Sequence, residues 1–248
     1  MIEPVAVFVI IAIFLVAALY SSVGHGGASG YLAMMALLSI APETARPAAL
    51  LLNVFVASIA AFQFCRAGHF DWKIFLPFAA GSVPLAFIGG LIRLPTGVYK
   101  MILGAVLILA AIRLAINFKT EDDESEQKNT PKFLTALFIG AVIGLISGLV
   151  GVGGGIFLTP ILLLMNWTQT KRAAGVSAMF ILVNSISGLL GNYAQVLSLP
   201  TSVWLWIAAA IGGGFLGATL GSRHFNSMTL RRVLAVGLLI AGAKLIFT

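Results

Sequence analysis

The stretch that decides the fold is Gly151-Val152-Gly153-Gly154-Gly155, which precedes a short apolar run at 156–165. A weaker copy, Gly24-His25-Gly26-Gly27-Ala28, precedes the run at 29–40. A segment of about 12 residues reaches only about 18 Å as a helix, whereas the hydrocarbon core of a bilayer is about 30 Å thick. Extended backbone must therefore precede each run at membrane depth, and glycine supports it because glycine accepts positive φ. Irregular backbone is tolerated there only where it is buried in protein or lines a wet cavity.

Composition indicates an integral membrane protein. The 248 residues are 60% hydrophobic and 9% charged, with a mean hydropathy of +1.05, whereas soluble domains carry about 25% charged residues. Apolar runs of about 20 residues favour helices over the alternating strands of about 10 residues in membrane barrels. The formal net charge of +7 is spread over short loops, which is typical of membrane topology and not of nucleic-acid binding. The single cysteine, Cys65, excludes an internal disulfide and a cysteine-rich metal site.

The apolar sequence divides into two halves joined by a charged linker. Five apolar segments precede the linker and five follow it, at about 5–20, 29–40, 47–64, 72–92, 98–116, 133–150, 156–167, 173–193, 203–220 and 230–247. The linker at 117–132 holds five of the eight acidic residues and is expected to be solvated. We therefore divide the chain into a first transmembrane repeat at 1–116, a cytoplasmic linker at 117–132 and a second transmembrane repeat at 133–248.

The two halves resemble each other in the order of their residues. The recurring positions are Gly24, Gly26 and Gly27 with Gly151, Gly153 and Gly154; Thr44, Arg46 and Ala48 with Thr170, Arg172 and Ala174; and Trp72, Gly81 and Gly89 with Trp204, Gly213 and Gly221. The offset between matched positions drifts only slightly, which indicates an internal duplication of the kind found in transporters. The other explanation is coincidence, since membrane helices are repetitive in composition.

Two topologies fit these segments. If the short runs cross the membrane, each half has five crossings and the halves are inverted. Eleven of the fifteen basic residues then face the cytoplasm together with the linker, and Arg46, Arg93, Lys100 and Lys244 lie outside. If the short runs dip in and return, the chain has eight spans and only seven basic residues face the cytoplasm. The positive-inside rule favours the first arrangement, with both termini outside. The expected fold is an all-α membrane bundle of two inverted repeats, each with one short broken helix after a glycine-rich loop.

The glycine clusters are the candidate binding site. At the start of a helix, backbone N–H groups have no intrahelical partner, and the terminus carries about half a positive charge. Two inverted copies would together approximate one positive charge, without a cationic side chain that is costly in lipid. This suits a small anion with several oxygens, held weakly enough to be released. The candidate substrate-binding residues of the two clusters are His25, Gly26, Gly27, Ser29, Gly153, Gly154 and Gly155.

Two asparagines within apolar segments complete the candidate site. Asn53 and Asn184 can donate to an oxyanion, although such side chains also commonly bond to a neighbouring helix. His25 is the one ionisable side chain expected near the site, where it can donate to the anion, carry a proton or bond to a backbone carbonyl. The chain has no HExxH or GxSxG motif and no paired intramembrane carboxylates, so we expect a protein that is not an enzyme and uses no metal or cofactor.

The run at 148–155, Gly-Leu-Val-Gly-Val-Gly-Gly-Gly, followed by Pro160, resembles the signature of the TauE/SafE sulfite exporter family. The resemblance covers nearly the whole chain, since it includes the length, the duplication, the central linker and a glycine cluster in each half. The first half departs from the usual form. His25 is inserted there, Ala28 and Ser29 stand where a further glycine is common, and Ala33 takes the place that matches Pro160.

The resemblance implies a multi-pass carrier in the inner or plasma membrane of a prokaryote. Such a carrier moves sulfite, thiosulfate or organosulfonates and is coupled to an ion gradient. The alternatives are an anion channel and a carrier for another small organic anion, such as a carboxylate. The expected partners are the small anionic substrate and the lipid bilayer, with a homodimer left open and nucleic acid excluded.

Overall fold

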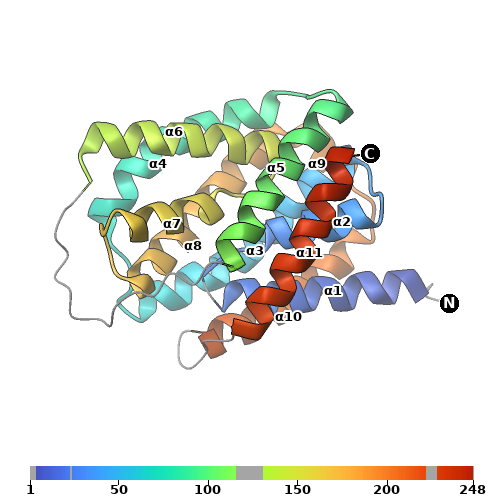
Figure 1. The fold of residues 1–248 in the computed structure, drawn as a ribbon, viewed down its shortest axis with the longest axis horizontal. Helices are drawn as coiled ribbons and strands as arrows, with labels where there is room; N and C mark the ends of the chain where they lie inside the picture. Colours follow the sequence, from blue (N-terminus) through green and yellow to red (C-terminus); the bar gives the residue numbers. More distant parts are fainter. Residues whose placement is uncertain (1–3, 23, 116–130, 222–227, 248) are drawn as a thin grey trace.

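The computed structural model describes residues 4–22, 24–115, 131–221 and 228–247, and over these residues the chain is all-helical (Figure 1). The helices are α1 (Pro4–Ser21), α2 (Ala28–Leu37), α3 (Pro42–Arg66), α4 (Trp72–Leu91), α5 (Thr96–Ala115), α6 (Phe133–Val150), α7 (Gly155–Leu164), α8 (Thr170–Gly191), α9 (Tyr193–Val196), α10 (Val203–Gly221) and α11 (Met228–Phe247). Each of the ten apolar segments expected from the sequence forms a helix, and the four-residue α9 is an addition. The expected linker at 117–132 lies almost wholly outside the described residues.

Five helices in the described part of the chain are long and apolar enough to cross a membrane, judged by length and composition: α3, α4, α6, α8 and α10. The short helices α2 and α7 have only 10 residues each, as the sequence indicated. Many large apolar side chains on the outside of the bundle are exposed, including Phe62, Phe138 and Phe215. Such a surface is suited to contact with lipid. The chain is thus an all-helical, multi-pass membrane protein.

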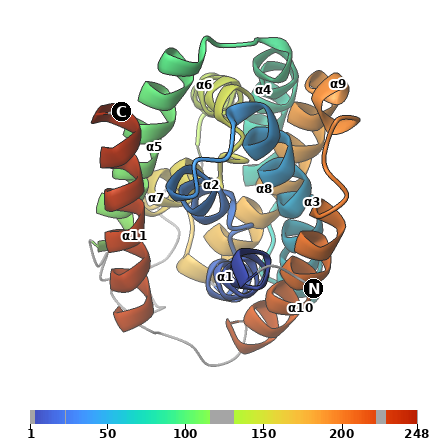
Figure 2. The same ribbon diagram turned by 90° about the vertical axis from the view of Figure 1, so that its right-hand side faces the viewer.

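Close helix pairs form the outside of the bundle. The pair α4 and α6 covers one side, and the pair α1 and α10 covers the opposite side, with α2, α3, α7 and α8 between them (Figures 1 and 2). The helices α5 and α11 pair along a third side. Glycines let both outer pairs approach closely, because Gly144 of α6 faces the backbone of Ser82 and Gly217 of α10 faces the backbone of Ala18.

Contacts between neighbouring helices give their relative directions. Gly140, Gly144 and Gly148 of α6 face Phe78, Ser82 and Ala86 of α4 in that order, so α4 and α6 run in the same direction. By the same reasoning α1 runs with α10, α3 with α10 and α4 with α8, whereas α3 opposes α8 and α5 opposes α11. Consequently α1 and α3 run in the same direction, although only a loop and α2 separate them. The chain returns along the bundle through that loop and α2, and in the same way through the second loop and α7.

The two short helices end in the same backbone conformation. Ser39 follows α2 with a φ of 57°, and Asn166 follows α7 with a φ of 51°. These positions are 127 residues apart, the same separation as Gly24 and Gly151. The reverse hydrogen bonds that close each end are also matched, from the N–H of Ile40 to the carbonyl of Met35 (2.9 Å) and from the N–H of Trp167 to the carbonyl of Leu162 (3.0 Å).

Candidate functional site

Asn53 joins the two glycine loops. The first loop, residues 24–27, precedes α2, and the second loop, residues 151–154, precedes α7. The Oδ1 atom of Asn53 accepts a hydrogen bond from the backbone N–H of Ala28 (3.0 Å). Its Nδ2 atom donates to the carbonyl of Val152 (3.2 Å) and lies 3.4 Å from the hydroxyl oxygen of Ser185 on α8. Asn53 is the twelfth of the 25 residues of α3, so the two loops meet halfway along this helix.

Close packing explains why glycine is needed in both loops. A Cβ atom on Gly26 would lie 3.0 Å from Cγ2 of Ile181, and a Cβ atom on Gly153 would lie 3.0 Å from the same carbon. Both would also collide with the amide of Asn53, and a side chain at Gly155 would collide with Ile181. Residues 24–36 and 151–156 are all buried. In this conformation Asn53 and Ile181 therefore fill the space between the loops.

Gly27 and Gly154 begin the short helices in a left-handed conformation. Their φ angles are 92° and 84°, values that strain any residue with a Cβ atom. Glycine supplies no capping side chain, so the first N–H groups of α2 and α7 need partners from outside the helix. For α2 this partner is Asn53, through Ala28. The amides at both helix starts, together with the helix dipoles, favour negative charge.

His25 connects the first loop to α7. Its Nε2 atom lies 3.3 Å from Oγ1 of Thr159, which lies 2.8 Å from the hydroxyl oxygen of Ser177 on α8 and 3.0 Å from the carbonyl of Gly155. All three side chains are buried, and His25 is 6% exposed. A chain of polar contacts thus runs from the first loop through α7 to α8. Sequence reasoning did not single out Thr159, although it directly precedes Pro160 of the family signature.

Ser29 lies in the first turn of α2, near α1. Its hydroxyl donates to the phenol oxygen of Tyr20, at 3.0 Å, and both residues are buried. This contact ties the start of α2 to the end of α1. Ser29 is therefore close to the first loop, as expected, but its hydroxyl hydrogen is occupied by Tyr20.

Asn184 has a different environment from Asn53. Its Nδ2 atom donates to the carbonyl of Phe180 in its own helix, at 2.9 Å, and its Oδ1 atom is buried without a hydrogen-bond partner within the described residues. Several residues of α8 face the loops and the start of α7, namely Ala174, Ser177, Phe180, Ile181 and Ser185. Among them, Ser177, Ile181 and Ser185 are spaced four apart and share one helix face. The spacing of Ser177 and Ser185 in the sequence indicates this helix face. Nothing in the sequence distinguishes Ile181, which lies between them, from other apolar residues of α8.

Arg46 is a buried cation that we expected, from its position in the sequence, to affect only the membrane topology. The residue is 4% exposed, and its guanidinium makes five hydrogen bonds of 2.6 to 3.0 Å to backbone carbonyls. The acceptors are Gly89, Gly90 and Ile92 at the end of α4 and Gly148 near the end of α6. Carbonyls at a helix end have no partner within the helix, so Arg46 supplies one. Its counterpart in the second half, Arg172, is exposed.

A groove of about 750 Å³ separates the second half of α3 from α10. It is lined by Ser58, Ile59, Phe62, Gln63, Arg66, Ala67, Phe215 and Thr219. The Nε2 atom of Gln63 donates to Thr219 across the groove, at 3.2 Å, and Arg66 is exposed at the end of α3. In contrast to α3 and α10, helices α4 and α8 pack closely against each other, since Gly191 faces the backbone of Phe87.

The donors of the candidate site are backbone amides, hydroxyls, the carboxamides of Asn53 and Asn184 and the imidazole of His25. Within the described residues, no three His, Cys, Asp or Glu side chains gather as a metal site would require. Amide and hydroxyl donors without fixed charge suit an anion that is bound and then released.

Comparisons with known proteins identify the family. A sequence model of the family described as Sulfite exporter TauE/SafE matches residues 9–245. The probable membrane transporter protein y4hK of Sinorhizobium fredii is 38% identical over 243 residues, which are 98% of each chain. Two proteins of Bacillus subtilis, also named probable membrane transporter proteins, are more distant. YunE is 25% identical over 84% of this chain and 82% of its own, and YdhB is 23% identical over 96% and 99%.

No solved structure matches the chain. The family description and the names of the relatives denote transport and not catalysis. With the multi-pass helical fold, these matches show that the chain is a membrane transporter belonging to the TauE/SafE sulfite exporter family.

Proposed function

We propose that this protein is a secondary transporter of small sulfur-containing anions, such as sulfite, thiosulfate or organosulfonates, in the inner or plasma membrane of a prokaryote. The observation that carries the proposal is the meeting of the two glycine loops at Asn53. Asn53 lies halfway along α3, which is long enough to span a bilayer, so the loops would lie near the midplane. A site at that depth can open to either face in turn, as alternating access requires.

Two inverted repeats, at 1–116 and 133–248, are the architecture that we propose for this transport. The matched φ angles of Gly27 and Gly154, and of Ser39 and Asn166, support a duplication. The helix directions support the inversion. Helices α1, α3 and α10 run in one direction and α4, α6 and α8 in the other, so α1 opposes α6, α3 opposes α8 and α4 opposes α10. Five crossings in each half would produce this relationship.

The proposed anion lies at the starts of α2 and α7, against Gly26, Gly27, Ser29, Gly153, Gly154 and Gly155, with His25, Asn53 and Asn184 as the candidate side chains. The Oδ1 atom of Asn53 already accepts from the N–H of Ala28. A carboxamide oxygen thus occupies the position that we assign to an oxygen of the anion. Binding then requires Asn53 and Ile181 to move, and a carrier needs such a difference between its empty and loaded states.

The groove between α3 and α10 is the route that we propose from one membrane face to the loops. Exposed Arg66 at its end would attract anions. Ser58 in the groove is five residues from Asn53, about 7.5 Å along the helix. The close packing of α4 against α8 closes the corresponding route of the other repeat. Exchange between these two arrangements would expose the site alternately to the two faces.

The sulfur chemistry of the substrate rests on the family description, because the relatives are named only as probable transporters. Uptake into proteoliposomes tests the proposal. We would offer sulfite, thiosulfate, sulfoacetate and acetate under imposed proton and sodium gradients. We expect saturable uptake of at least one sulfur anion, driven by one gradient and accelerated by the same anion on the opposite side. Flux that never saturates would identify a channel, and uptake of acetate alone would reassign the substrate class.

A further inference from the structure

Tyr31, in the first turn of α2, has a hydroxyl with no hydrogen-bond partner within the described residues. Its side chain is completely buried, at 0% exposure. Buried hydroxyls are normally paired, so an isolated one calls for a physical reason. The phenol of Tyr20 is paired with Ser29, and the phenol of Tyr99 donates to the carbonyl of Val150 at 3.2 Å. Tyr31 therefore differs from the other buried tyrosines of the described chain.

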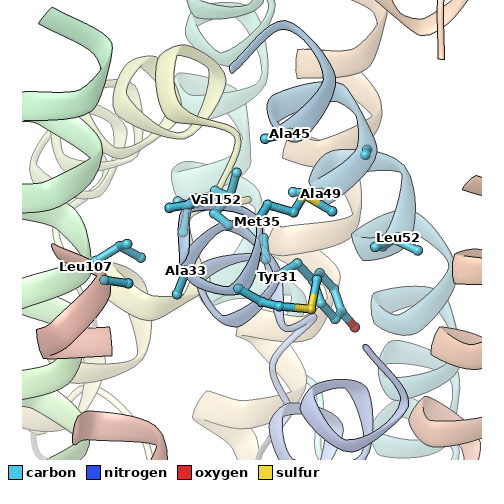
Figure 3. Close-up of a cluster of buried hydrophobic side chains, with 14 of the residues drawn as sticks. Tyr31, Ala33, Met35, Ala45, Ala49, Leu52, Leu107 and Val152 are labelled. Atoms are coloured by element: carbon cyan, nitrogen blue, oxygen red, sulfur yellow. The ribbon is translucent and has the colours of Figure 1, made fainter. Parts of the chain in front are cut away.

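The Tyr31 hydroxyl lies at the N-terminus of α2. A Cβ atom built on Gly27, the cap residue of this helix, would lie 2.9 Å from the Tyr31 hydroxyl oxygen. Side chains on a helix lean towards its N-terminus, which carries the phenol past the first turn. Figure 3 shows the oxygen of Tyr31 pointing away from the apolar side chains around Ala33 and Leu107. The free donor is thus placed where the amides and the dipole of α2 already favour negative charge.

We propose that the Tyr31 hydroxyl donates a hydrogen bond to the transported anion at the start of α2. This inference rests on the proposed function and adds a side-chain donor to the backbone amides. The anion supplies the acceptor that the Tyr31 hydroxyl lacks among the described residues. A hydrogen bond from a hydroxyl to a charged oxygen is stronger than one to a neutral oxygen. The phenol is neutral, so it strengthens binding without placing a fixed charge in the bilayer.

The test is Tyr31→Phe, which removes an oxygen that bonds to no atom of the described residues. We expect the variant to fold with an unchanged melting temperature in detergent, and the KM for anion uptake to rise about tenfold, the usual effect of losing one hydrogen bond to a charged group. The matched control is Tyr99→Phe. It removes the bond to Val150 and should lower the melting temperature while leaving the KM within about twofold.

A second readout separates this inference from the proposed function. Sulfite, thiosulfate and acetate are each added to the purified proteins, and the rise in melting temperature is measured. An anion that stabilises wild type but not Tyr31→Phe supports the role of Tyr31, whether or not it is transported. Equal stabilisation of both, or an unchanged KM in the variant, overturns the inference and leaves the transport function standing. Absence of both uptake and stabilisation in wild type overturns the two proposals together.

Discussion

The Nη2 atom of Arg46 lies 2.6 Å from the carbonyl oxygen of Gly148, and this bond joins the beginning of α3 to the end of α6. Gly148 precedes the second loop by three residues, so the bond fixes the point from which that loop departs. The same guanidinium holds the end of α4 through Gly89, Gly90 and Ile92. One buried side chain therefore anchors two helix ends beside the candidate site, and its fork of donors is already occupied by backbone.

Arg46→Lys should destabilise the protein strongly. An ammonium group has three donors and no planar fork, so it cannot replace five bonds to four carbonyls. We expect a loss of about 3 kcal/mol, since buried carbonyls are left unpaired. Thermal unfolding in detergent measures the effect. Arg172→Lys is the matched control, because Arg172 is the exposed counterpart in the other half and should change stability by less than about 0.5 kcal/mol. Equal melting temperatures for the two variants would contradict the anchoring role.

Asn53→Asp should abolish transport. The substitution keeps an acceptor for the N–H of Ala28 but removes the donor to Val152, and it places a carboxylate between the loops. That charge would repel an anion at short range. Initial uptake rates in proteoliposomes are the measurement. Asn166→Asp makes the same chemical change at an exposed position and should retain the wild-type rate. Substantial uptake by Asn53→Asp would place the substrate elsewhere.

Gly154→Ala should reduce uptake about tenfold, and Gly154→Leu should eliminate it. A Cβ atom at this position would lie 2.9 Å from atoms of Ile143 and Phe180, and its φ of 84° is unfavourable for alanine by about 1–2 kcal/mol. Uptake and melting temperature are measured together. Gly97→Ala serves as the control, because nothing lies within 4 Å of its Cβ position and alanine is the better helix former. The prediction fails if the alanine variant transports normally.

Labelling from the two membrane faces should distinguish the ends of α3 and α8. These helices run in opposite directions, so residues just beyond their C-terminal ends should face opposite sides of the membrane. In a Cys65→Ala background, Leu197→Cys should react with an impermeant maleimide added to intact cells. Ala67→Cys should react only after the cytoplasmic face is opened. Both positions are exposed in the structure. Labelling of the two cysteines from the same face would contradict five crossings in each half.

The sequence predicted the helices well because each apolar run forms most of one helix, although α3 begins five residues before its run. It also predicted the two short helices. Each glycine cluster marks the beginning of a helix, and the apolar run that follows is too short to span a bilayer as a helix. The short α9 was not expected, because four residues leave no periodic signal. Which helices pair with one another was beyond the sequence, since pairing depends on contacts between distant segments.

For the candidate site, the sequence singled out the loops and Asn53 but missed several neighbours. Ile181 is an ordinary apolar residue in an apolar helix, and only its contacts with Gly26 and Gly153 distinguish it. The sequence did not indicate a role for Thr159, because threonine in a membrane helix usually bonds to its own backbone. Its contact with His25 depends on the fold. Arg46 was treated as a topological charge, since its acceptors are carbonyls that a sequence does not display.

The pairing of α1 with α10 has a consequence for how the chain is made. α1 leaves the ribosome before α2 to α9, yet it packs chiefly against α10. The hydroxyl of Ser21 finds its partner, the carbonyl of Gly214 at 2.9 Å, only after nearly 200 further residues have been synthesised. The packing of α1 against α10 must therefore follow the insertion of α1 into the membrane, and α1 contacts lipid until α10 has been synthesised. The two halves, expressed as separate polypeptides, should then associate within the membrane into one complete bundle.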